Sequence, residues 1–283
     1  MIYYLFIISI NFIFCLGINS VSLPHNALEM STSNSGIGNS QNIGINFASI
    51  NNIKNTFSSS SINWYEGVKG GNISYKWGTD NHHYINLYTL SANEIELWGE
   101  IPDDSPIDFF DVHHISIGYG FGKNFSDKIN FGIKNTIIYN QLYIDESFGY
   151  NIDLGVSYLY NHNIALGFSI NQLGFEQNNQ TNSTYYPLLI GSGLTININK
   201  LNSTINTDII YNQELSDELT FKMSSITTFS QFFSFVLGYN YSNSKSEPSI
   251  GFSFKYRKIQ LDYGVAFHTA LGNPTIFSLK YNI

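Results

Sequence analysis

The chain has 283 residues, of which 12 % are charged and 16 % are aromatic, and its formal net charge is −8. A soluble domain usually has about twice that share of charged residues. The negative charge argues against nucleic acid as a partner, because phosphate binding needs basic surface. The mean hydropathy of −0.08 excludes a bundle of membrane-spanning helices. These properties fit a chain in which only alternate residues face lipid.

Residues 1–22 form the most apolar part of the chain. An apolar run from residue 2 to residue 14 is followed by small and polar residues, including Ser20 and Ser22. This pattern predicts a secretory signal peptide that is removed on export. The alternative is an uncleaved anchor, because no Lys or Arg precedes the apolar run. The only cysteine, Cys15, lies in this segment, so the mature chain would have no disulfide.

Residues 23–58 are polar, rich in small side chains and without strand-like alternation. The segment is too polar to span lipid and too short for a domain, which leaves a disordered linker or a hatch folded inside a barrel. We expect the hatch, because a wide barrel has more interior than its own side chains fill. Asn side chains could also satisfy polar groups of its inner wall. The residues expected to form this plug are Asn34, Gly36, Gly38, Asn46, Ala48 and Ile50.

The remainder of the chain, residues 59–283, alternates apolar and polar residues with a period of two. Near the C-terminus, for example, Ile259 and Leu261 alternate with Gln260 and Asp262. This period is typical of strands with two unlike faces. Short and longer connectors also alternate, as in a barrel with short periplasmic turns and longer outer loops. We therefore predict an all-β fold, a transmembrane antiparallel β-barrel of about 14 strands with an N-terminal plug. The predicted strands cover residues 60–66, 69–78, 81–91, 113–122, 127–139, 147–160, 163–173, 186–199, 203–211, 219–229, 232–242, 247–257, 258–268 and 274–283.

Charged residues within these strands fall on the polar face. A Lys on the lipid face at mid-depth would cost about 2–4 kcal/mol, so the polar face is expected to line the lumen. Tyr residues at strand ends would lie at the two membrane interfaces. The charged residues expected to face the lumen are Lys134, Asp153, Asp208, Lys255, Asp262 and Lys280.

Few residues form a pattern typical of catalysis or metal binding. The pairs His82–His83 and His113–His114 cannot each chelate one metal, because adjacent strand residues point to opposite faces. Acidic residues in loop 92–112 could hold Ca²⁺ or simply form a solvated loop, and we expect the latter. No elbow motif surrounds a candidate nucleophile. The sequence therefore predicts a protein that is not an enzyme, with no catalytic residue, cofactor or metal.

Short motifs along the chain resemble the PorV/PorQ group of outer-membrane barrels, which are relatives of the FadL-type transporters. Residues 34–39 (NSGIGN) and 46–50 (NFASI) stand where that group has a small-residue segment and an Asn-Pro-Ala-Gly-Leu-like motif, with Phe47 in place of the Pro. Further matches are Gly149, Asp153, Gly155 and Tyr158, then Pro187, Leu188, Gly191 and Gly193, and finally Leu261, Asp262 and Tyr263.

The resemblance implies a fourteen-stranded barrel in the bacterial outer membrane, in contact with its lipid and plugged by its N-terminal segment. It implies an accessory, cargo-receiving component of type IX protein secretion, with secretion-system subunits or secreted proteins as partners. The alternative is a FadL-like channel for hydrophobic small molecules. A second alternative, from another class, is a structural or adhesive surface β protein. Composition and spacing do not choose among the three.

Overall fold

The structure is a computed structural model that describes residues 23–38, 42–52, 54–98, 105–178, 183–213, 218–243, 246–268 and 272–283, without the side chains of Glu66 and Glu218. The predicted signal peptide and three residues after Gly38 lie outside the described residues. No helix in the described ranges has the length and apolar character needed to cross a membrane.

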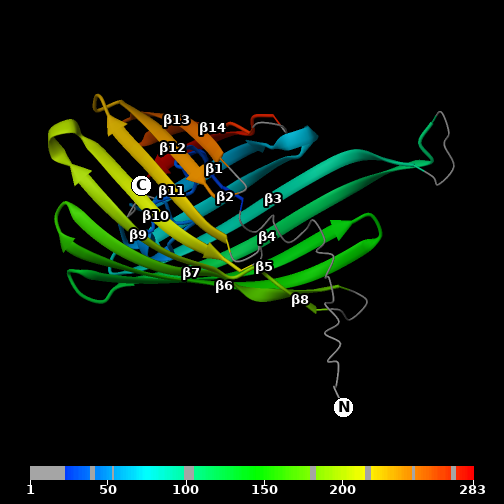
Figure 1. The fold of residues 1–283 in the computed structure, drawn as a ribbon, viewed down its shortest axis with the longest axis horizontal. Coiled ribbons are helices and arrows are strands. Elements are labelled where there is room, and N and C mark those ends of the chain that lie inside the picture. The colour runs from blue at the N-terminus through cyan, green and yellow to red at the C-terminus, as the bar shows by residue number, and fades with distance from the viewer. Residues whose placement is uncertain are drawn as a thin grey trace, which may run out of the picture.

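The described chain is almost entirely β-structure (Figure 1). The strands are β1 (Thr56–Asn63), β2 (Lys69–Gly78), β3 (Asn81–Leu97), β4 (Asp108–Asn124), β5 (Ile129–Leu142), β6 (Asp145–Asn161), β7 (Ile164–Asn178), β8 (Ser183–Tyr185), β9 (Leu189–Ile198), β10 (Ser203–Asn212), β11 (Glu218–Thr228), β12 (Phe233–Tyr241), β13 (Ser246–Tyr256), β14 (Ile259–Ala266) and β15 (Thr275–Asn282). The helical pieces are α1 (Ala27–Ser31) and the 3₁₀ turns η2 (Phe47–Asn52), η3 (Tyr65–Gly67) and η4 (Asn199–Leu201).

The strands form one closed antiparallel barrel. Strands that follow each other in sequence are paired, and β15 pairs with β1 to close the wall. Both β8 and β9 lie along β7, so together they occupy one position in the wall. The barrel therefore has fourteen strand positions, which confirms the predicted all-β antiparallel barrel of about 14 strands.

The two faces of the wall differ as the alternation predicts. On β10, Ile209 is 45 % exposed, whereas its neighbours Asp208 and Ile210 are 1 % and 4 % exposed. Large apolar side chains on the other strands, such as Phe221, Phe252 and Phe277, are exposed in the same way. A barrel with this apolar exterior suits a lipid environment.

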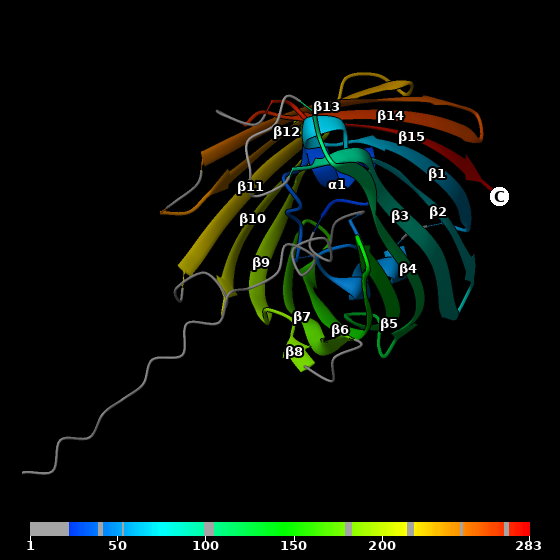
Figure 2. The same cartoon turned by 90° about the vertical axis from the view of Figure 1, so that its right-hand side faces the viewer.

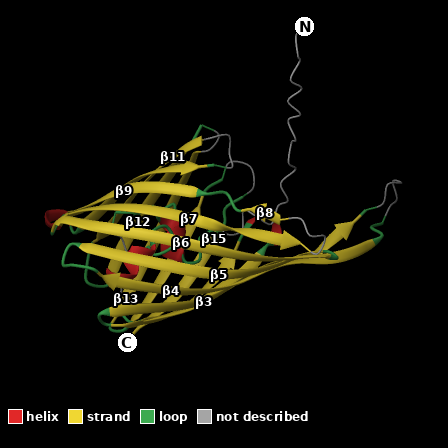
Figure 3. Ribbon diagram, turned by 90° about the horizontal axis from the view of Figure 1, so that it is seen from below, coloured by secondary structure: helices red, strands yellow, loops and turns green. Residues whose placement is uncertain are grey.

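Several strand boundaries differ from the prediction. The first strand is β1, Thr56–Asn63, and not 60–66, so the predicted boundary between plug and barrel at residue 58 falls inside β1. Its first half reads Thr-Phe-Ser-Ser-Ser-Ser, and such polar residues are hard to distinguish from those of the preceding segment. In addition, β3 and β4 run far into the predicted loop 92–112 and extend well beyond the rest of the barrel (Figures 1 and 3). Backbone pairing continues there, with Ile95 opposite Phe110.

The wall is irregular where β6, β7 and the β8–β9 position meet. The register between β6 and β7 shifts between Ile152 and Leu154, and Gln172 on β7 has a φ of 64°. Opposite this bulge, residues 186–188 separate β8 from β9. The predicted strand 186–199 is thus interrupted at its start, where Pro187 cannot donate a ladder hydrogen bond.

Candidate functional site in the barrel interior

The N-terminal segment, described over residues 23–38 and 42–52, lies within the barrel. Figure 2 looks into the barrel and shows α1 enclosed by the strands. Leu23 packs near Trp64 and Val68, which lie at the end with the longer loops. At the other end, the backbone N–H of Ile283 donates to Asn55 at 2.9 Å, beside the start of β1. The segment therefore runs from the long-loop end of the barrel to the short-turn end.

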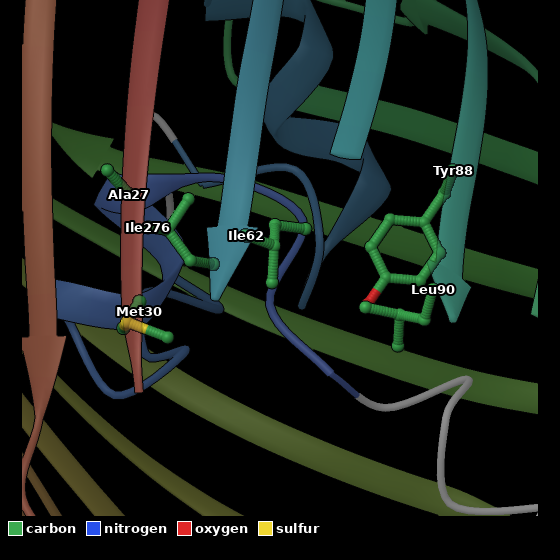
Figure 4. Close-up of a cluster of buried hydrophobic side chains, with 6 residues drawn as sticks. All are labelled: Ala27, Met30, Ile62, Tyr88, Leu90 and Ile276. Carbon is green, nitrogen blue, oxygen red and sulfur yellow. The ribbon is translucent and has the colours of Figure 1, made fainter. Parts of the chain in front are cut away.

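The helix α1 begins at an N-cap and packs on β12 to β15. Asn26 caps it, with its side-chain oxygen accepting from the backbone N–H of Glu29 at 3.0 Å. The N–H of Ala27 donates to Ser278 Oγ at 2.9 Å. Met30 contributes to a buried cluster that includes Ile62, Tyr88 and Ile276 of the wall (Figure 4). The helix thus packs against an apolar patch of the wall, although the lumen is mostly polar.

The middle of the segment is held by one carboxylate. Asp208 on β10 accepts the backbone N–H of Gly36 at 2.5 Å and that of Ile37 at 3.2 Å. Asp208 is 1 % exposed, so these two hydrogen bonds lie in a water-poor site. Hydrogen bonds to a charged group are among the stronger ones. Beside them, a Cβ on Gly38 would meet the backbone nitrogen of Thr195 at 2.5 Å, so the segment approaches the wall closely there.

The last part of the segment, η2, packs on glycine-lined wall. A Cβ added to Gly120 would lie 2.0 Å from Phe47 Cζ, and one added to Gly132 would lie 2.5 Å from the Phe47 backbone. Asn46 donates to the carbonyl of Ile37 at 2.6 Å and to that of Val156 at 3.1 Å. One side chain thereby supplies hydrogen bonds to a backbone carbonyl of the segment and to one of the wall.

The predicted plug residues occupy different parts of this arrangement. Asn46, Ala48 and Ile50 are fully buried, and Ile50 packs with Phe47 and Tyr84. Asn34 is half-buried and has a φ of 53°. Gly36 and Gly38 make the close approaches described above.

The six predicted lumen charges are not gathered in one site. Lys280 pairs with Asp262 at 2.9 Å, and Asp208 holds the segment. Asp153 accepts from the backbone N–H of Gln172 at 2.9 Å. Lys255 is exposed, since it lies near the end of β13 beside the turn to β14. Lys134 is 9 % exposed and lines a cavity.

That cavity, of about 480 Å³, lies between the segment and the long-loop end of the barrel. His25 and Met30 line it from the segment, Trp64 and His268 from the long-loop end, and Lys134 from the middle of the wall. Small-molecule sites commonly have volumes of about 300–1,000 Å³. The cavity is therefore large enough for a small solute.

Two ionisable groups of the segment are perturbed by burial. Burial raises the pKa of the Glu29 carboxyl, although hydrogen bonds from the His25 N–H and Asn26, each at 2.7 Å, act in the opposite direction. Burial also lowers the pKa of His25, which stacks on Tyr88 with ring centroids 4.2 Å apart. Uncharged forms of both side chains are thus favoured inside the lumen.

Within the described residues, no group of three or more His, Cys, Asp or Glu side chains is arranged to hold a metal ion. The two predicted histidine pairs divide between faces. His82 and His114 are buried, whereas His83 contacts Tyr119 and Phe121 on the outer face.

Solved structures with the same architecture are outer-membrane channels. The toluene transporter TodX of P. putida matches with a TM-score of 0.70 at 11 % identity, over 91 % of this chain and 98 % of that one. The fold is that of the FadL-like outer-membrane channels. The toluene transporter TbuX of Ralstonia pickettii matches with a TM-score of 0.66 at 8 % identity, over 91 % and 98 % of the two chains. A FadL homologue of Pseudomonas aeruginosa matches with a TM-score of 0.58 at 9 % identity, over 92 % and 99 %.

The FadL-like barrel places the chain in the bacterial outer membrane, as predicted. No family model matches the sequence, and no curated protein matches it.

Sequence reasoning named Lys134 and Asp153 as lumen-facing but did not find the uncharged polar residues beside them in the cavity. Thr136, Asn151 and Gln172 line it together with Lys134 and Asp153. The alternation of residues along a strand would place Thr136 and Asn151 on the inner face. It does not indicate which inner positions the N-terminal segment leaves uncovered. The inward position of Gln172 depends on the bulge in β7, which no periodicity predicts.

Proposed function

We propose that the protein is an outer-membrane channel of the FadL-like type that lets small hydrophobic molecules through, with residues 23–52 as its plug. The observation that carries this proposal is the shared architecture with a toluene transporter over nearly the full length of both chains. The likeness concerns the fold, and the proposed activity extends it to this chain.

The interior supports this proposal. The cavity beside the segment is lined in part by apolar side chains from several elements, including Met30, Ile45, Ile138, Leu189 and Ile210. An apolar solute would gain free energy there at roughly 25 cal/mol for each Å² of apolar surface removed from water.

No observation favours the secretion role that the PorV/PorQ resemblance implies. The similar structures named above are toluene transporters and a FadL homologue. The adhesive alternative is likewise without support from a specific observation.

The experiment measures uptake of radiolabelled toluene by a Gram-negative host that lacks aromatic-hydrocarbon channels, with and without this protein. We expect faster uptake with the protein. Ile210→Trp, which fills the cavity, should remove most of the gain. Its matched control is Ile209→Trp, on the adjacent residue that faces lipid, which should leave uptake unchanged. Uptake equal to that of the host alone would contradict the proposal.

A further inference from the structure

One side of the cavity carries a compact polar cluster on three neighbouring strands, β5, β6 and β7. Lys134 pairs in register with Asp153, and Thr136 pairs with Asn151. Gln172 joins them through its backbone N–H on Asp153. We call these five residues the β5–β7 cluster. All five line the cavity.

Hydrogen-bonding capacity in this cluster is left unused. Thr136 Oγ1, Asn151 Oδ1 and Gln172 Oε1 are buried and have no hydrogen-bond partner among the described residues. Their side chains are 6 %, 2 % and 3 % exposed. Buried polar atoms normally have partners, and an unsatisfied one costs about 1–3 kcal/mol. Three such atoms facing one cavity point to a ligand that supplies the missing groups.

The cluster also holds a buried ammonium group. Lys134 is 9 % exposed, and within the described part of the chain no carboxylate lies at ion-pairing distance from it. Asp153 opposes it across β5 and β6, so the charges of the cluster sum to zero. A carboxylate ligand would meet Asp153 as well as Lys134, whereas an uncharged hydroxyl can accept from Lys134 and donate to an amide oxygen.

The cavity also has an apolar side, which adjoins this cluster. Ile138 lies two residues from Thr136 on β5, and Leu189 packs with Ile45 and Ile210. The site therefore offers both polar and apolar side chains within one volume of about 480 Å³.

We infer that this cavity binds uncharged, hydroxyl-bearing small hydrophobic molecules, with the hydroxyl on the β5–β7 cluster and the apolar body against Ile138, Leu189 and Ile210. This inference rests on the proposed function and names the solute class. A plain hydrocarbon would fill the apolar side and leave the three polar atoms unpaired. The site thus discriminates by hydrogen bonding rather than by size.

The test uses three probes of similar size: toluene, benzyl alcohol and benzoate. Binding to the full chain in lipid nanodiscs is measured by saturation-transfer NMR, with nanodiscs lacking protein as the blank for partition into lipid. We expect benzyl alcohol to bind roughly fivefold more tightly than toluene, the effect of about one net hydrogen bond. Benzoate should bind no more tightly than benzyl alcohol.

Variants with side chains of nearly the same shape test whether the β5–β7 cluster causes the preference for benzyl alcohol. Thr136→Val and Asn151→Leu should each lower the ratio of benzyl alcohol to toluene affinity roughly fivefold, with little change for toluene. The control is Thr204→Val, the same substitution at a residue on the inner face of β10 that does not line the cavity. Heat-modifiable migration on a gel verifies that each variant forms a barrel.

Three outcomes overturn the inference. An affinity ratio that is the same in the wild-type chain and both variants would mean that water alone occupies the cluster. Preferred binding of benzoate, lost in Lys134→Met, would identify a carboxylate site instead. Binding of none of the probes would exclude the cavity as a solute site. Because binding is measured without transport, these results are separate from a failure of toluene uptake, which bears on the channel function alone.

Discussion

Two stretches of the same pair of strands, β5 and β6, meet the N-terminal segment in opposite ways. Near the short-turn end, Gly132 pairs with Gly155 and the wall has no side chains, so Phe47 packs directly on its backbone. The next inward pairs are Lys134 with Asp153 and Thr136 with Asn151, and these line the cavity. The segment thus packs where the wall lacks side chains and leaves space where the wall has polar ones.

This contrast separates two roles of the interior. The glycine-lined part holds the segment in place by close packing. In such a close-packed region, even one added methyl group lowers stability. In the cavity part, buried polar atoms lack hydrogen-bond partners from the protein. This lowers stability, and it is found in binding sites more than in packed cores. Each variant below changes one contact, so its effect on hydrogen exchange is expected near that contact.

The largest effect is expected from Gly132→Ala. The added Cβ would lie 2.5 Å from the backbone carbon and oxygen of Phe47, which cannot rotate away. We expect η2 to be displaced at a cost of about 1–3 kcal/mol, measured as faster amide hydrogen exchange of residues 42–52. The matched control is Gly71→Ala on β2, where the nearest atom would be the Ser60 carbonyl oxygen at 3.1 Å. Equal exchange in both variants would show that η2 does not depend on this close packing.

A smaller effect is expected from Asp208→Asn. The amide keeps one acceptor oxygen but loses the charge that strengthens the bonds from Gly36 and Ile37. The segment should lose about 1–2 kcal/mol of local stability, again measured by hydrogen exchange, now of residues 35–38. Asp145→Asn, at an exposed position at the start of β6, serves as the control. If both variants exchange like the wild type, Asp208 does not anchor the segment.

The smallest effect concerns pH and Glu29. Because burial raises the pKa of this carboxyl in the folded chain above its ordinary value of 4.5, the protonated form is favoured inside the lumen. Its contribution to stability is therefore fully present below pH 4.5 and is lost as pH rises through the raised value. Relative to Glu29→Gln, the wild-type segment should lose stability between pH 4.5 and pH 8, measured by comparing the hydrogen exchange of the two proteins at each pH. A pH-independent difference would contradict this assignment.

Much of this architecture follows from local pattern. Alternation such as that of Ile259 and Leu261 with Gln260 and Asp262 reports which face of a strand is apolar, and connector length reports which end of the barrel is which. The features that escaped prediction depend on contacts between distant parts of the chain. The polar start of β1 becomes a strand only because β2 and β15 pair with it, and the cavity exists only because of the path of the segment across the inner wall.

The most direct test of the account is the single-channel conductance of the protein without residues 23–52, compared with that of the complete mature chain in planar bilayers. This deletion leaves β1, which begins at Thr56, intact, and the gel shift on heating verifies the barrel. We predict clearly larger conductance steps for the deletion, because the segment makes its contacts across the barrel from one end to the other. Equal conductance of the two proteins would contradict the proposal that this segment plugs the channel.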